Sequence, residues 1–335
     1  MHQKHKRIRY FLIAFILISL IIGYFYFYKY TYLGYDYYES YYSKIVQQEG
    51  VKAAFDELKR LYKLDPDTIS MCHQITHIIG RASAEKYKDV GGAFQEGNSF
   101  CWSGYYHGVM EGILSDYSLN NLKNKINTIC SNIAGKESYT FDYYNCVHGL
   151  GHGIMYISNN ELFDALKVCD YLDGWWEQNS CYGGVFMENI ITDDKNHFTK
   201  YLKEDDVYYP CNAVEEKYKY SCYLMQTSHM LDLTDWDFSK VFGLCSQIDK
   251  PYIDTCYQSL GRDASGYTES DVVKTRKICL IGKDFRQQSN CVIGAVKDFI
   301  AYYHSDVEAK KLCEYLPTEL KNVCFETLQN FVQIF

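Results

Sequence analysis

The chain has 335 residues, enough to bury a large core in one extended domain or in two compact ones. It contains 34 tyrosines but only four prolines, which favours packed amphipathic helices over a loop-rich β-sandwich. Its formal net charge of −8 offers little attraction to a phosphate backbone, so we expect no nucleic-acid partner.

The first 28 residues have the pattern of a signal anchor. Residues 1–9 contain four basic residues and no acidic one, and residues 10–28 read YFLIAFILISLIIGYFYFY. About 20 apolar residues are needed to cross a hydrocarbon layer of ~30 Å. A cleaved signal peptide is the alternative, but the apolar run exceeds a typical h-region and no A-x-A-like site follows it.

The basic residues also predict the orientation. The positive-inside rule places residues 1–9 in the cytoplasm as a basic tail, and everything beyond the predicted transmembrane helix (residues 10–28) outside. We therefore predict a single-pass protein of the cell membrane whose extracytoplasmic part carries 30 basic and 42 acidic residues, a net charge of −12. Residues 29–48 are rich in tyrosine and form either a stalk or a first helix.

All fourteen cysteines lie in this predicted ectodomain, and an even number in an oxidising compartment indicates disulfides. Twelve of them form couples that are 11 to 16 residues apart, which we predict to be bridged: Cys130 with Cys146, Cys169 with Cys181, Cys211 with Cys222, Cys245 with Cys256, Cys279 with Cys291 and Cys313 with Cys324. For the remaining Cys72 and Cys101, a bridge between neighbouring hairpins is one option.

The couples also define a repeat, because their second members recur every 33 to 41 residues. A helical pattern ends at each first cysteine, as in LFDALKVC, and a second helical run opens with the second cysteine, as in CVIGAVKDFI. Each unit is therefore predicted to be a helical hairpin. The N-caps expected for its first helices are Asn159, Asp235, Ser270 and Ser305.

The predicted fold is all-α: an α-solenoid of disulfide-stapled antiparallel helical hairpins behind one N-terminal transmembrane helix. A tight connection between the two antiparallel helices of a hairpin brings the Cα atoms of its two cysteines close enough for a disulfide. The helical-repeat ectodomain is predicted over residues 49–335, with a His-rich part over 49–158 and disulfide-couple hairpins over 159–335.

This array resembles the tetratricopeptide and Sel1-like class of helical-hairpin repeats, especially its secreted, cysteine-stapled members. Residues 51–66, VKAAFDELKRLYKLDP, come closest to such a repeat. The Trp, Leu-Gly and Pro signature of the family is absent, and the unit length varies. The resemblance implies an α-solenoid, often with a protein-binding surface, and it transfers no catalytic residue.

The second helices of the first three hairpins each carry two polar residues that are four positions apart, which places both residues on one helix face. Two imidazoles at this spacing can bind one cation, and neighbouring helices ~8–10 Å apart can share it. The predicted ligands of a transition metal ion (zinc, iron, copper or manganese) are His73, His77, His107, Glu111, His148 and His152, with His229 as a further candidate. The alternative is a polar core in which these histidines bond to tyrosine hydroxyls and helix carbonyls.

A second polar pattern follows later in the chain. Seven residues after the cysteines of the later second helices stand Glu188, His229, Asp263 and Asp298. Such a column predicts a groove for a peptide or glycan, and the alternative is an ordinary solvated face. No G-x-S-x-G, Walker, HExxH or C-x-x-C-H motif occurs, so no catalytic residue is assigned.

Three functions fit these patterns. The first is a membrane-anchored extracytoplasmic helical-repeat protein with a His-rich metal site in its N-terminal hairpins, and this is the reading we adopt. The second is a metal-free solenoid scaffold that binds a protein or polymer partner. The third is a metal-dependent oxidoreductase or hydrolase.

Overall fold

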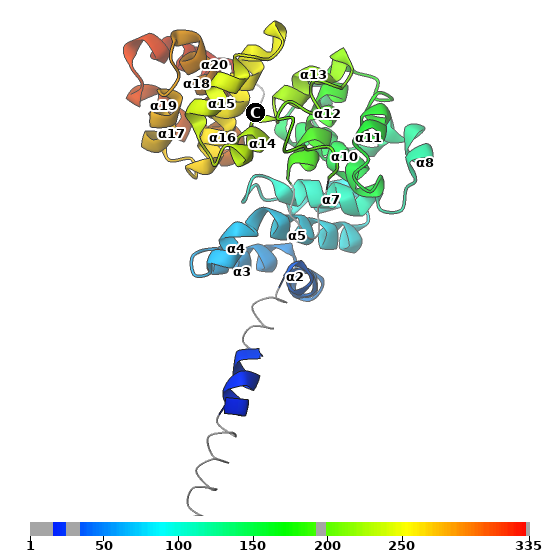
Figure 1. Ribbon diagram of the computed structural model, residues 1–335. Helices are drawn as coiled ribbons and strands as arrows, with labels where there is room; N and C mark the ends of the chain where they lie inside the picture. The colour runs from blue at the N-terminus through cyan, green and yellow to red at the C-terminus, as the bar shows by residue number, and fades with distance from the viewer. Residues whose placement is uncertain (1–15, 25–33, 192–198, 333–335) are drawn as a thin grey trace, which may run out of the picture.

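The computed structural model describes residues 16–24, 34–191 and 199–332, and this part of the chain is helical without β-strands (Figure 1). Its first half contains α2 (Tyr35–Glu49), α3 (Val51–Tyr62), α4 (Pro66–Ser70), α5 (Cys72–Tyr87), α6 (Val90–Gln95), α7 (Gly104–Leu114), α8 (Leu119–Lys123), α9 (Ile126–Ile129), α10 (Phe141–Ile157), α11 (Leu162–Cys169) and α12 (Trp175–Ile190). The second half contains α13 (Glu216–Tyr223), α14 (Thr227–Leu233), α15 (Phe238–Cys245), α16 (Ile253–Tyr267), α17 (Val272–Cys279), α18 (Phe285–Tyr303), α19 (Val307–Tyr315) and α20 (Thr318–Val332).

Disulfides close each predicted hairpin, although Cys211 lies in a turn before α13 and not in a helix. All six predicted couples are bridged, with Cα atoms 5.4 to 5.9 Å apart. Cys72 and Cys101 form a seventh bridge, which connects the start of α5 to the segment before α7. The architecture is thus consistent with a stapled helical-hairpin repeat, in which closing each short loop contributes roughly 3 kcal/mol.

The hairpin turns differ in detail from the predicted ones. The second helices from α10 onward begin several residues before their cysteine, so the bridge lies about one turn inside the helix. The first helices also begin later than expected. Asp235 and Ser270 take left-handed backbone angles in the turn, while Asp237 and Asp271 accept the capping hydrogen bonds of α15 and α17.

The second helices of successive hairpins pack on one another and form the inner layer of the array. Helix α5 packs on α7, α7 on α10, and α10 on α12, while α16 and α18 form the corresponding pair farther along. Two glycines allow close contact in the first group. A Cβ at Gly108 would collide with the carbonyl oxygen of His77, and one at Gly184 with that of His148.

The array curves until its late hairpins contact its early ones. The Trp102 ring, just before α7, packs on Tyr302 of α18 with centroids 5.3 Å apart. The Phe141 ring at the start of α10 meets His304 edge-on at 3.8 Å. Figure 1 shows the yellow-to-red helices α15–α20 lying across from the green helices α10–α13. The second helices therefore face a common interior.

The N-terminal predictions are only partly within the described chain. Residues 16–24 are helical, but the rest of the predicted transmembrane span (residues 10–15 and 25–28) and the basic tail (residues 1–9) lie outside the described residues. Within the described ranges, no helix is both long and apolar enough to span a bilayer. Most of the tyrosine-rich segment forms α2, which buries Tyr42 and packs against α5.

Candidate metal centre

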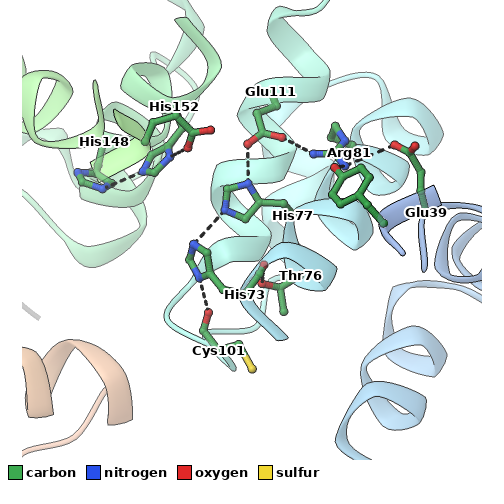
Figure 2. A network of polar contacts seen from close by, with 11 residues as sticks. Glu39, His73, Thr76, His77, Arg81, Cys101, Glu111, His148 and His152 are labelled. Carbon is green, nitrogen blue, oxygen red and sulfur yellow. Dashed lines mark hydrogen bonds and ion pairs between the residues drawn. The ribbon is translucent and has the colours of Figure 1, made fainter. Parts of the chain in front are cut away.

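The histidines of α5, α7 and α10 lie close together, and Figure 2 shows those of α5 and α10. Helix α5 supplies His73 and His77, α7 supplies His107, and α10 supplies His148 and His152. All of these histidines except His73 are buried, and the two members of each pair are four residues apart, as the sequence predicts. Glu111 of α7 and Glu188 of α12 complete the cluster.

The α5 pair has its two Nε2 atoms face to face. The Nε2 atoms of His73 and His77 lie 3.1 Å apart. The Nδ1–H of His73 donates to the carbonyl oxygen of Cys101 at 2.8 Å, and that of His77 donates to Oε1 of Glu111 at 2.5 Å. With the proton of a neutral ring on each Nδ1, each Nε2 presents a lone pair to the other.

The α10 pair repeats this arrangement. The Nε2 atoms of His148 and His152 lie 3.3 Å apart. Nδ1 of His148 faces the carbonyl oxygen of Ser180 at 3.2 Å, and Nδ1 of His152 contacts Oε2 of Glu188. In both pairs, one histidine is oriented by a backbone carbonyl and the other by a glutamate from the next second helix.

His107 lies between the two pairs. Its ring stacks on that of His152, with centroids 3.8 Å apart and planes 9° apart, and its centroid lies 5.3 Å from that of His77. Its Nδ1 is buried and has no hydrogen-bond partner among the described residues. The ligand atoms of His73, His77 and His107 all lie within 4.8 Å of one another, and so do those of His107, His148 and His152. Each group is therefore close enough to hold a metal ion.

Burial favours the neutral form of three of these imidazoles, those of His73, His107 and His148. It lowers the pKa of His73 to about 3, with a further contribution from His77, and the pKa of His148 to about 4. Burial and the neighbouring histidines hold the pKa of His107 well below its usual range. Neutral imidazole is the form that binds metal ions, so the protonation state at neutral pH suits ligation.

The two carboxylates differ in charge environment. Burial alone would raise the pKa of Glu111, but His77 and Arg81 outweigh it and hold that pKa below its usual range. Arg81 donates from Nη1 to Oε2 of Glu111 at 2.5 Å. Burial and the charge of Glu111 raise the pKa of Glu188 well above its usual range. His77, Glu111 and Glu188 form a third group whose ligand atoms all lie within 4.8 Å of one another.

A cavity of about 490 Å³ adjoins the cluster. The α5 pair and both glutamates line it, together with Arg81 and with residues of α2 that include Tyr35, Asp36 and Glu39. His107, His148 and His152 are not among its lining residues. The α5 pair thus meets a space large enough for a small molecule, whereas the α10 pair lies deeper.

The remaining predicted residues lie elsewhere. Nε2 of His229 faces the carbonyl oxygen of Lys203 at 3.0 Å, and His229 belongs to none of the three ligand groups found in the described chain. Asp263 accepts hydrogen bonds from Thr227 and Ser228 at 2.6 and 3.0 Å. Asp298 is half-buried with its Oδ2 atom enclosed by protein, and desolvation raises its pKa to about 6. Of the four residues in the predicted polar column, only Glu188 lines the cavity.

Sequence reasoning assigned Glu188 to a groove and overlooked Arg81 and Tyr35. Arg81 follows His77 by four residues, so the helical spacing that found the histidines places it on the same face. Tyr35 receives a hydrogen bond from Nη2 of Arg81 and carries no comparable signal in the sequence.

Comparison with known proteins identifies no relative, since no family model, no curated protein and no solved structure matches the chain.

Proposed function

We propose that this protein binds a transition metal ion (zinc, iron, copper or manganese) through the histidines of α5, α7 and α10. We further propose that it does so outside the cytoplasm, anchored to the membrane by residues 10–28. The observation that carries the proposal is the pairing of imidazole Nε2 atoms whose Nδ1 atoms already have partners in the protein.

The separations match those of ligands on one ion. Two imidazole nitrogens bound at ~2.0–2.1 Å to a tetrahedral Zn²⁺ lie roughly 3.3–3.4 Å apart. The Nε2 separations in the two pairs are 3.1 and 3.3 Å. Two lone pairs at this distance repel each other, and a cation between them removes the repulsion. Five imidazoles with one or two carboxylates suit all four metals.

The outer contacts support the same conclusion. Histidines that bind metals usually donate their second N–H to a carboxylate or a backbone carbonyl, which fixes the tautomer and ring orientation. His77 and His152 use Glu111 and Glu188, while His73 and His148 use backbone carbonyls. A polar core built only for packing has no need to orient four rings in this way.

In the α5 pair, a proton between the two Nε2 atoms could take the place of a metal ion. If His77 were an imidazolium ion, its Nε2–H would donate to His73 while its Nδ1–H donated to Glu111. The buried ion pair would then stabilise a metal-free scaffold, which is the competing function. The seven disulfides are compatible with both functions, because they require only an oxidising compartment.

Elemental analysis separates the two possibilities. The full chain, produced in a disulfide-forming compartment, is compared with a His148→Ala/His152→Ala variant. A His229→Ala variant provides a matched control, because His229 is also buried and bound to a carbonyl. We expect near-stoichiometric metal in the parent and the control, and less metal in the double variant. A parent without metal would leave the scaffold function.

A further inference from the structure

The metal centre is built from two copies of one local arrangement. In the first copy, α5 supplies the histidine pair and α7 supplies Glu111; in the second, α10 supplies the pair and α12 supplies Glu188. Three contacts correspond: the facing Nε2 atoms, the backbone carbonyl on the first histidine and the glutamate on the second. The copies differ in that Nδ1 of His148 also lies 3.3 Å from the hydroxyl of Tyr144. Each copy is therefore a complete two-histidine position for one ion.

The sequences around the two glutamates are also related. Residues 105–112 read YYHGVMEG and residues 182–189 read YGGVFMEN, so Glu111 aligns with Glu188. In this alignment His107 stands where α12 has Gly184. The extra imidazole of α7 lies between the two copies and is within ligand distance of both pairs. His107 can therefore supply a third ligand at either position.

The two positions differ in access. The cavity is lined by His73, His77 and the glutamates, whereas the α10 pair is absent from its wall. His152 is fully buried and covered on one side by the stacked ring of His107. An ion at the α5 pair would have a free side toward the cavity, and an ion at the α10 pair would be enclosed by protein.

The cavity wall limits what can approach the open side. Four carboxylates line it, those of Asp36, Glu39, Glu111 and Glu188, against one guanidinium, that of Arg81. Arg81 is itself bound to Glu111 and Tyr35. These acidic groups already balance much of the charge of a bound metal ion, so a neutral donor molecule is the class of ligand that fits.

We infer that the centre holds two metal ions, an enclosed one at His148 and His152 and an open one at His73 and His77, and that the open ion takes a small neutral donor molecule from the cavity. This inference rests on the proposed metal-binding function. It adds the number of ions, their different access to the cavity and the class of ligand. An ion with a free coordination position beside a cavity is the arrangement of catalytic rather than structural metal sites.

The test uses the full chain loaded with Co²⁺, whose visible absorption reports its ligands, and imidazole as the neutral probe. We expect two cobalt ions per chain, and a spectral change that saturates at one imidazole per two cobalt ions. Azide, an anion of similar size, should bind more weakly than imidazole. Cobalt is measured again after each titration, so that removal of metal is not mistaken for binding.

Variants assign the two positions. A His148→Ala/His152→Ala variant should keep one cobalt ion that responds to imidazole, and a His73→Ala/His77→Ala variant should keep one that does not. If either variant fails to fold, the imidazole stoichiometry of the parent alone decides. One cobalt ion per parent chain, or two imidazoles bound per chain, would overturn the inference while leaving the metal-binding function intact. Absence of cobalt would overturn both.

Discussion

The Nδ1 atom of His77 lies 2.5 Å from Oε1 of Glu111, so an imidazole of α5 is oriented by a carboxylate of α7. The same carboxylate accepts a hydrogen bond from Arg81 through its other oxygen. Glu111 is 2% exposed, and both of its oxygens are used within the protein. Orientation of the α5 pair therefore depends on contact between two helices from different hairpins.

Replacement of this carboxylate should weaken metal binding without removing a histidine. In Glu111→Gln, His77 loses its charged acceptor and Arg81 loses its buried counter-charge. We expect metal affinity to fall about 10- to 100-fold and the free energy of unfolding to fall by about 3 kcal/mol. Competition with a chromophoric chelator measures the first quantity, and denaturant unfolding measures the second.

Glu39→Gln is the matched control for that variant. Glu39 also lies beside Arg81, at 3.5 Å, but it is half exposed and touches no histidine of the cluster. Its replacement should leave the equilibrium metal affinity within about twofold of the parent, since exposed ion pairs contribute little. Equal losses of affinity in both variants would mean that overall charge, and not orientation of His77, controls binding.

The close approach of α5 and α7 should be as important as the ligands themselves. In Gly108→Ala the new methyl group would collide with the carbonyl oxygen of His77, which would push the helices apart. We expect a loss of about 1–3 kcal/mol in unfolding free energy together with weaker metal binding. Gly243→Ala, in the last turn of α15 with no atom near its Cβ position, should instead gain up to about 1 kcal/mol. Equal stability in the two variants would argue against this packing.

Much of the fold can be predicted from the cysteine spacing. A pair 11 or 12 residues apart, with a helical pattern on each side, leaves a hairpin as the simplest arrangement, and the structure confirms those pairings. Contact between Trp102 and Tyr302 could not be predicted. It depends on small rotations between successive hairpins, which add up over the array and leave no local signal.

The candidate site, like the fold, could be predicted from the sequence only in part. Helical spacing correctly grouped each histidine pair, because residues four apart share a face on any regular helix. Counting residues from the cysteines placed His229 and Glu188 at the same height, yet only Glu188 reaches the cluster. The second helix of the His229 hairpin is interrupted, since α13 ends at Tyr223 and α14 begins at Thr227. This interruption changes the direction of every later side chain in that helix.

An aspartate whose Oδ2 atom is enclosed by protein should make stability depend on pH. Burial raises the pKa of Asp298 to about 6, above the value of roughly 3.9 in an unfolded chain. The unfolded state therefore loses this proton first as pH rises, so stability falls between about pH 4 and pH 6 and is constant above. Asp298→Asn should remove this fall and gain about 2–3 kcal/mol at pH 7.

The comparison is made by denaturant unfolding from pH 4 to pH 7.5, with Asp116→Asn as the control at an exposed position. Only the difference between variant and parent is interpreted, because it cancels other groups that titrate in this range. Arg262 and Asp263 are the charged side chains whose fields act on Asp298, and they are retained in both variants. A parent and an Asp298→Asn variant with parallel pH profiles would show that Asp298 is hydrated.

The N-terminal segment should hold the protein in a membrane. Residues 10–28 are apolar, follow four basic residues, and precede a chain that contains every cysteine. The full chain should remain with membranes after alkaline carbonate extraction, whereas a chain that begins at residue 34 should be released with the same metal content. Protease added to the extracytoplasmic side should cut the region after residue 30 and spare the tail. Mass spectrometry of the membrane form gives the decisive comparison, because a chain that has lost residues 1–28 would indicate a cleaved signal peptide instead of an anchor.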